Sequence, residues 1–198
     1  MSENASACED CLSERSPPLR WEPLCEANAE VFRETSNAAF LHSPNGGVLD
    51  QEGVADLIRK HAGRPSLLQV GYVHDKPAVT LQLELRHGSD GVGGVIDGLA
   101  VAPGFQGKGL GRAGLRRGIN TLRTLGAASI SLTVMDSNLP AVSLYLKSGF
   151  RQTRVLSSWF SRSLDTSGAE APSVVSFHIR EKGCRRPPPT DPEQRWKG

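Results

Sequence analysis

The stretch from Leu99 to Arg112 reads LAVAPGFQGKGLGR, and it decides how the rest of the chain is interpreted. Its apolar start predicts a short strand that ends before Pro103, and a basic amphipathic helix follows the glycines. Three of the five residues 107–111, where this helix begins, are glycines. The first four N–H groups of a helix have no internal partner, and the helix dipole is positive there. The stretch therefore predicts an anion site, with phosphate as the expected group.

The composition indicates one ordinary globular domain. The chain has 198 residues, of which 38% are hydrophobic and 22% are charged, enough for a hydrophobic core. Its net charge of +2 is too small to favour non-specific nucleic-acid binding. No apolar run approaches the roughly 18 residues of a membrane helix, and the polar, acidic start does not resemble a secretory signal. We expect a cytoplasmic monomer or homodimer with no nucleic-acid or membrane partner.

The two ends of the chain and the cysteines indicate neither a metal nor a redox site. Cys8 and Cys11 form a CxxC, but a structural zinc site needs four ligands and no second matching pair follows. A thioredoxin-like motif would follow a strand, so free thiols in a reducing cytosol are expected. Residues 1–17 and 182–198 are expected to be a disordered leader and tail, and residues 18–181 the domain.

Hydrophobic periodicity predicts alternating helices and strands between these ends. Helices are expected over residues 27–40, from about residue 50, over 109–125 and over 140–149. Strands are expected over residues 67–73, 78–86, 95–101, 130–134, 154–161 and 174–180, with a glycine-rich loop over 88–94. This order predicts a mixed α/β sheet in one layer with helices packed on it.

Two nucleotide-binding motifs fit the glycine stretch poorly. A P-loop ends in GK followed by Ser or Thr, whereas Lys108 precedes Gly109 here, so nucleotide hydrolysis is not favoured. Gly109-x-Gly111-x-x-Gly114 matches the dinucleotide fingerprint literally, and Asp136 stands where a ribose-binding acid belongs. However, these glycines come well after the end of the strand, and too few residues follow for a doubly wound fold. Dinucleotide binding stays a lower-ranked alternative.

Two sequence blocks together resemble one known family. Gln106-x-x-Gly109-x-Gly111 resembles the acetyl-CoA loop of the GNAT superfamily of N-acetyltransferases, whose pattern is [QR]-x-x-G-x-[GA]. The block NLPAVSLYLKSGF, residues 138–150, resembles the family's N-x-x-A-x-x-L-Y-x-x-x-G-F segment. The resemblance covers residues 95–150 well, and the helix–helix–hairpin order before them also fits. It implies the acyl-CoA N-acyltransferase fold, with a central, mostly antiparallel sheet splayed between its fourth and fifth strands and helices on both faces.

The resemblance implies that acetyl-CoA is the co-substrate and that two segments bind it. Its pyrophosphate would bind beside Gln106 on the backbone amides of Gly107, Lys108, Gly109, Leu110, Gly111 and Arg112, where a Cβ would block close approach. The charges of Lys108 and Arg112 either add to this site or are solvated at the surface. Pantetheine would lie along Leu99, Ala100 and Val101, whose free backbone groups would bind it as an added strand does.

The resemblance also assigns the chemistry to particular side chains. Asn138 and Tyr145 lie two helical turns apart and share a helix face. In the family the Asn contacts the coenzyme and the Tyr hydroxyl protonates the departing thiolate. Without these roles, Asn138 is a helix N-cap and Tyr145 a half-buried aromatic. Asp97 is the candidate base for the acceptor ammonium, expected to be partly buried on the apolar face of its strand, and Glu84 is the alternative.

These observations predict an N-acetyltransferase in which a small-molecule or protein amine attacks acetyl-CoA directly. No covalent enzyme intermediate is implied, so neither a cysteine nor a metal is needed. The alternative is a non-catalytic acyl-CoA-binding regulatory module. Residues 41–47 and 162–172 are expected to shape the acceptor site, and neither segment carries the signature of a particular amine.

Overall fold

The computed structural model describes residues 17–41, 48–89, 91–156 and 174–180. The strands are β1 (Arg20–Pro23), β2 (Leu68–Val73), β3 (Lys76–Gly88), β4 (Gly91–Val101), β5 (Ser129–Met135), β6 (Arg151–Leu156) and β7 (Val174–Arg180). The helices are α1 (Ala29–Phe40), α2 (Gln51–Lys60), α3 (Leu110–Thr124) and α4 (Leu139–Lys147), with short 3-10 turns η2 (Glu26–Asn28), η3 (Pro65–Leu67) and η4 (Pro103–Phe105). The CxxC, most of the expected leader and the whole expected tail lie outside the described residues.

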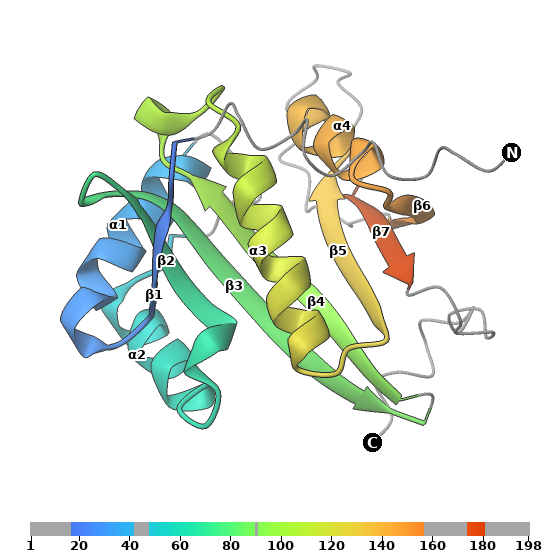
Figure 1. Ribbon diagram of the computed structural model, residues 1–198, viewed down its shortest axis with the longest axis horizontal. Helices are drawn as coiled ribbons and strands as arrows, with labels where there is room; N and C mark the ends of the chain where they lie inside the picture. Colours follow the sequence, from blue (N-terminus) through green and yellow to red (C-terminus); the bar gives the residue numbers. More distant parts are fainter. Residues whose placement is uncertain (1–16, 42–47, 90, 157–173, 181–198) are drawn as a thin grey trace, which may run out of the picture.

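The sheet is mixed and opens at one point. Its strand order is β1-β2-β3-β4-β5-β7-β6, and every neighbouring pair is antiparallel except the parallel pair β4 and β5. That pair extends only from Gly93 opposite Ser129 to Ile96 opposite Leu132, whereas β3 stays paired with β4 as far as Val101. The two strands therefore separate beyond Ile96, and Figure 1 shows them diverging below α4. The predicted splay is confirmed.

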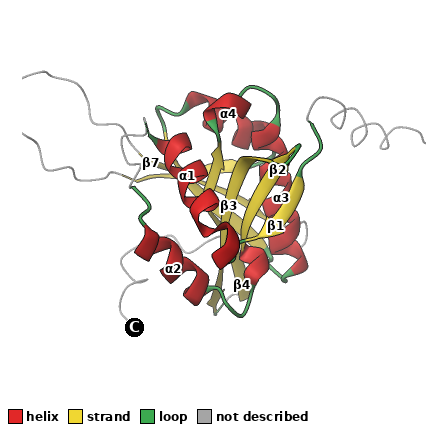
Figure 2. Cartoon of the chain, turned by 90° about the vertical axis from the view of Figure 1, so that its left-hand side faces the viewer, coloured by secondary structure: helices red, strands yellow, loops and turns green. Residues whose placement is uncertain are grey.

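Helices cover both faces of this sheet, as predicted. Helix α3 crosses one face, while α1 and α2 lie on the other (Figure 1 and Figure 2). The core under α3 contains Leu81, Leu83, Ile96, Leu115, Ile119, Leu122, Ile130 and Leu132. The core under α1 and α2 contains Phe32, Val54, Leu68 and Val70. Burial of each such side chain stabilises the fold by roughly 1.5–3 kcal/mol, so two apolar layers hold the open sheet together.

Two glycines allow α3 to pack directly on β4. A Cβ at Gly114 would lie 2.6 Å from Leu99 Cδ1, and a Cβ at Gly94 would lie 2.9 Å from Leu122 Cδ1. Real Cβ atoms do not approach this closely in a tightly packed interior, so both positions favour glycine. Gly114, the last glycine of the dinucleotide-like pattern, therefore has a packing role that needs no nucleotide.

Most predicted elements are confirmed, and two boundaries are wrong. The segment predicted to be a loop over residues 88–94 is mostly strand, since β4 begins at Gly91. Pairing with β3 and the contact with Leu122 outweigh the low strand propensity of glycine there. Strand β6 begins at Arg151, ahead of the predicted residue 154, and residues 157–161 lie outside the described part.

No helix in the described ranges combines the length and the apolar character that crossing a membrane requires.

Candidate active site

A loop of bare amides lies between η4 and α3. Gly107 and Gly109 have φ of 74° and 78°, a left-handed conformation that glycine adopts readily. The N–H groups of residues 107–111 donate to no acceptor within the described ranges, while those of Arg112 and Ala113 both donate to the Gly109 carbonyl, at 3.1 and 3.2 Å. Five successive N–H groups at the positive end of a 15-residue helix thus lie where the sequence predicts an anion site.

Two side chains of this loop hold it in place. The Gln106 amide Nε2 donates to the Val101 carbonyl at 3.1 Å, which ties the loop to the end of β4. Lys108 Nζ donates to the Gly104 carbonyl at 2.9 Å and lies 5.4 Å from the centroid of the Phe105 ring. Arg112 is exposed and has no ion-pair partner within the described residues. Of the two expected cations, Arg112 is therefore the one that is not already engaged.

The free edge of β4 presents backbone groups to the gap beside β5. Ala102 N–H donates to the Ala78 carbonyl at 2.9 Å, so the polar groups of residue 102 face β3. Because successive residues alternate along a strand, those of Ala100 also face β3, and those of Leu99 and Val101 face the gap. Of the three residues expected to bind pantetheine, Leu99 and Val101 thus have suitable backbone groups. Ala100 does not, and its side chain is buried.

A β-bulge sets the direction of Asp97. Gln82 is opposite Gly98 and Leu83 is opposite Ile96, so Asp97 is the extra residue in β4. Its carboxylate Oδ2 accepts a hydrogen bond of 2.6 Å from Gln82 Nε2, and its side chain is exposed. The expectation of a partly buried Asp97 on the apolar face is therefore wrong. The bulge interrupts the alternation: Ile96 and Leu99 pack against α3, and Asp97 turns toward Gln82.

Glu84, the alternative base, is held by two cations. Its carboxylate oxygens lie 2.9 Å from Lys60 Nζ and 2.9 Å from Arg86 Nη2. The hydrogen bond from Lys60, supported by that from Arg86 and opposed by partial burial, lowers the pKa of Glu84. A carboxylate with a lowered pKa is a weaker base. Its surroundings therefore suit Glu84 to a structural ion pair rather than to proton transfer.

The helix after β5 carries the two remaining candidates. Asn138 Oδ1 accepts the Ala141 N–H at 3.2 Å, so Asn138 is the N-cap of α4. Tyr145 is 8% exposed and packs against Phe150, with ring centroids 6.0 Å apart. Burial raises the pKa of Tyr145 to about 12, so its phenol stays protonated at neutral pH. The side chain is more deeply buried than the half-buried aromatic expected for a structural residue.

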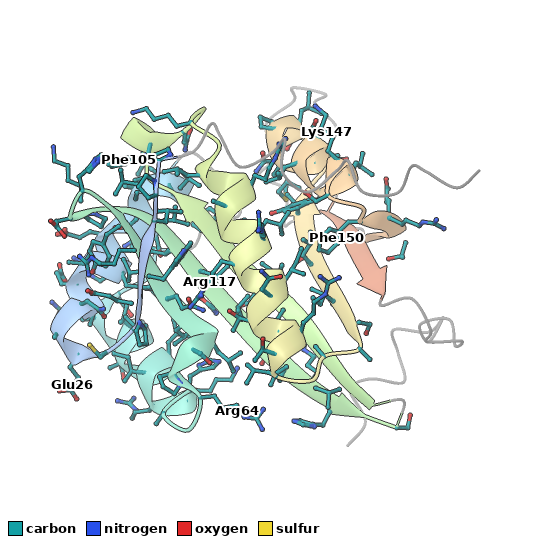
Figure 3. The ribbon with its side chains drawn as sticks, viewed as in Figure 1. Glu26, Arg64, Phe105, Arg117, Lys147 and Phe150 are labelled. Carbon is teal, nitrogen blue, oxygen red and sulfur yellow. The ribbon has the colours of Figure 1, made fainter. Side chains whose placement is uncertain are left out.

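The site extends on both sides of α3. Figure 3 shows Phe105 on one side of this helix, by the amide loop, and Phe150 on the other. A hypothetical Cβ at Gly111, at the start of α3, would lie 3.5 Å from Leu144 Cδ2 of α4. The amide loop, the free edge of β4 and α4 therefore meet around one opening in the sheet. Within the described residues, no group of three or more His, Cys, Asp or Glu side chains could hold a metal ion.

Gln82 and the bulge that faces it were not predicted from the sequence. The signal was present in the spacing of the apolar side chains of β4. Ile96 and Leu99, which pack on the same face, are three residues apart, whereas a regular strand repeats every two. The sequence predicts an uninterrupted alternation from Val95 through Asp97 to Val101, which would place Asp97 on the opposite face from the one it occupies.

Several known proteins are similar to this chain in sequence and in architecture. The family model described as Acetyltransferase (GNAT) family matches residues 22–150. A mycothiol acetyltransferase of Propionibacterium freudenreichii subsp. shermanii is 32% identical over 135 residues, which cover 67% of this chain and 43% of the relative. The ribosomal protein bS18-alanine N-acetyltransferase of Escherichia coli K12 is 33% identical over 81 residues, covering 41% of this chain and 53% of that protein. The matched region is thus less than half as long as the mycothiol enzyme.

A solved structure supports the same fold. Arabidopsis thaliana Naa50, in complex with the bisubstrate analogue CoA-Ac-MVNAL, superposes with a TM-score of 0.64 at 16% sequence identity, covering 82% of this chain and 99% of that chain. At this identity the likeness shows the architecture alone. Because the family model spans more than half of the chain and includes β4, the amide loop and α4, the protein belongs to the GNAT acetyltransferase family.

Proposed function

We propose that the protein transfers an acetyl group from acetyl-CoA to an amine by direct attack. The observation that carries this proposal is the run of five N–H groups, residues 107–111, that have no acceptor within the described part of the chain. Such a run at a helix N-terminus suits the negatively charged pyrophosphate of acetyl-CoA. The GNAT family membership of the chain supports the thioester as the reactive group.

The cofactor would bind along β4 and the loop that follows it. The backbone groups of Leu99 and Val101 that face the gap would hydrogen-bond the amides of the pantetheine arm, as an added strand does. Gln106 and Lys108 support this binding indirectly, because their hydrogen bonds fix the shape of the loop. Arg112 is exposed beside the amides and would add a positive charge. Asn138 would contact the coenzyme from the start of α4.

In this proposal, Asp97 accepts the proton that the acceptor amine must lose. An alkylammonium has no lone pair for attack, and its ordinary pKa of about 10.4 keeps it protonated at neutral pH. Asp97 lies next to the last paired residue of β4, Ile96, where the strands part and the thioester would arrive. The neutral amine then attacks the thioester carbonyl, forms the C–N bond and gives a tetrahedral adduct whose nitrogen carries one proton more than the amide product. Its collapse breaks the C–S bond, releases the CoA thiolate and passes this second proton to solvent.

Tyr145 would stabilise the departing thiolate by hydrogen bonding. Its pKa is raised to about 12, whereas a thiol has a pKa of about 8.5. Full proton transfer from the phenol to the thiolate would therefore be uphill by about 5 kcal/mol. Donation of a hydrogen bond has no such cost, and it lowers the energy of the developing negative charge. In this scheme the proton that finally resides on the CoA sulfur comes from the released ammonium proton or from water.

The acceptor is a small-molecule or protein amine. Relatives are named for mycothiol and for alanine of ribosomal protein bS18, so the family match supports both classes. We place the reaction in the cytoplasm, where acetyl-CoA is used by soluble enzymes, and expect a monomer or homodimer.

Calorimetry with acetyl-CoA and thiol-release assays test the proposal. The amines would be an alanine-initiated peptide, lysine methyl ester, glucosamine and spermidine. The expected result is acetyl-CoA binding and turnover of at least one amine, with kcat lowered about tenfold or more in Tyr145→Phe. Tight binding without turnover of any amine would instead favour the regulatory module. Retention on NAD but not on CoA resin would favour the dinucleotide alternative and contradict the proposal.

A further inference from the structure

A neutral side chain holds the candidate base of this protein in place. Gln82 Nε2 donates a hydrogen bond of 2.6 Å to Asp97 Oδ2, from the strand next to that of the carboxylate. The contact depends on the bulge, because Gln82 is paired with Gly98 and the extra residue Asp97 turns to the same face. Gly98 has no side chain to cover the pair, and a Cβ there would lie 3.4 Å from Gln82 Cβ. The pair is therefore open to a substrate on this face.

The surroundings of Asp97 differ from those of Glu84, which is two residues from Gln82 on the same face of β3. Glu84 is bound by Lys60 and Arg86, whereas Asp97 has no ion-pair partner in the described ranges. A nearby cation typically lowers the pKa of a carboxylate by 1–3, which weakens it as a base. An amide donor carries no net charge. It can fix the orientation of the carboxylate while the negative charge stays available to an ammonium group.

The other charged groups on this side of the sheet are engaged elsewhere or exposed. On α1, Arg33 pairs with Glu30, and on α2, Arg59 pairs with Asp56. The remaining titratable groups of these two helices are Glu34, Asp50, Glu52 and His61; Asp50 caps α2, and His61 Nδ1 bonds the Leu57 carbonyl. Among the described residues, Gln82 is thus the side chain that hydrogen-bonds Asp97.

We infer that Gln82 is a positioning residue for acetyl transfer: it holds the Asp97 carboxylate at the point where β4 leaves β5, oriented to take the proton of the acceptor amine. This inference rests on the proposed function. It differs from a purely structural role, because the effect of Gln82 should pass through Asp97. If Gln82 only stabilised the sheet, replacing it would lower kcat by the same factor whether or not the Asp97 carboxylate were present.

A double-mutant cycle separates these roles. Gln82→Met keeps the length of the side chain and removes the donor, and kcat with the best amine is expected to fall roughly tenfold while the acetyl-CoA Kd is unchanged. In an Asp97→Asn background the same substitution should lower kcat by less than about twofold, because the group being positioned is already gone. Equal losses in the two backgrounds would overturn the inference.

The charge variant gives a second, independent readout. Gln82→Glu places a carboxylate beside Asp97, which disfavours its ionised form, so the acid limb of kcat should move to higher pH by about one unit. Glu84→Gln is the matched control on the same face, and it should leave this limb in place. An unmoved acid limb in Gln82→Glu, or an equal movement in Glu84→Gln, would overturn the inference.

The contact can also be measured without an acceptor. In a carbon-detected NMR spectrum at neutral pH, the Asp97 carboxyl resonance should shift in Gln82→Met relative to the wild type, because the substitution removes the hydrogen bond to that carboxylate. An unchanged resonance would contradict the inference. Absence of turnover with every amine would count against the proposed function, and this measurement would still decide the role of Gln82.

Discussion

From Gly93 to Ile96, β4 is hydrogen-bonded to strands on both sides, whereas beyond Ile96 it is paired with β3 alone. The first half is locked into the sheet, and its glycines let α3 pack closely. The second half has a bulge, an exposed carboxylate and backbone groups that face a gap. Backbone groups on the open edge of a strand can pair with a ligand as an added strand does. In the proposed function the second half of β4 binds the ligand in this way, while the first half stabilises the sheet.

The largest expected effect lies in the second half of β4, at its carboxylate. Asp97→Asn should lower kcat about a hundredfold, since it removes the proposed proton acceptor. The free energy of unfolding should change by less than about 0.5 kcal/mol, because the side chain is exposed. Steady-state kinetics and chemical denaturation measure the two quantities. Asp136→Asn, the same substitution at an exposed site after β5, is the control, and an equal loss of kcat there would contradict the assignment.

Tyr145, across the gap from β4, should control stability at alkaline pH. Burial raises the pKa of its phenol from 10 to about 12 in the folded state. A raised pKa means that the unfolded chain ionises first, so this stabilisation is complete below about pH 10 and is lost as the pH rises to about 12. The linked loss in the free energy of unfolding is roughly 3 kcal/mol.

Thermal unfolding between pH 9 and 12 measures this effect. Tyr145→Phe cannot ionise and should lose less stability over that range than the wild type. Tyr72→Phe is the matched control, since Tyr72 is the only other tyrosine and burial raises its pKa less strongly. If Tyr145→Phe and the wild type lost stability in parallel, the phenol would not be buried as the structure has it.

The same small substitution should separate the two halves of β4 by stability. Gly94→Ala, in the first half, would place a Cβ 2.9 Å from the fully buried Leu122 and should lower the free energy of unfolding by about 1–3 kcal/mol. Gly98→Ala, in the second half, meets only an ordinary contact of 3.4 Å and should change it by less than about 0.5 kcal/mol. Urea denaturation measures both changes. Equal losses in the free energy of unfolding would contradict the difference proposed between the two halves of β4.

The sequence predicted best what local chemistry and periodicity determine. The amide loop and the N-cap at Asn138 follow from glycine and capping rules that act over a few residues. The predictions of a loop at residues 91–94 and of Asp97 on the apolar face were wrong. Both features depend on contacts with β3 and α3, which are distant in sequence.

The ion pairs of Glu84 were not predictable for the same reason. Lys60 lies on a different element and is 24 residues away along the chain, so only the folded structure places it beside the carboxylate. The bulge alone left a trace in the sequence, as the spacing of three between Ile96 and Leu99. Features that depend on local sequence could thus be predicted, whereas contacts between elements distant in sequence could be found only in the folded structure.

Isothermal titration of acetyl-CoA into Gly111→Glu tests the amide site most directly. Gly111 has room for a side chain, since a Cβ there makes an ordinary contact of 3.5 Å with Leu144, and a glutamate in the first turn of α3 suits the helix dipole. The protein should therefore fold, while a negative charge among the bare amides should weaken binding at least about a hundredfold. Gly104→Glu adds the same charge three residues before the amide run, where a Cβ meets nothing within 4 Å, and should bind as the wild type does. Undiminished affinity in a folded Gly111→Glu protein would contradict the account.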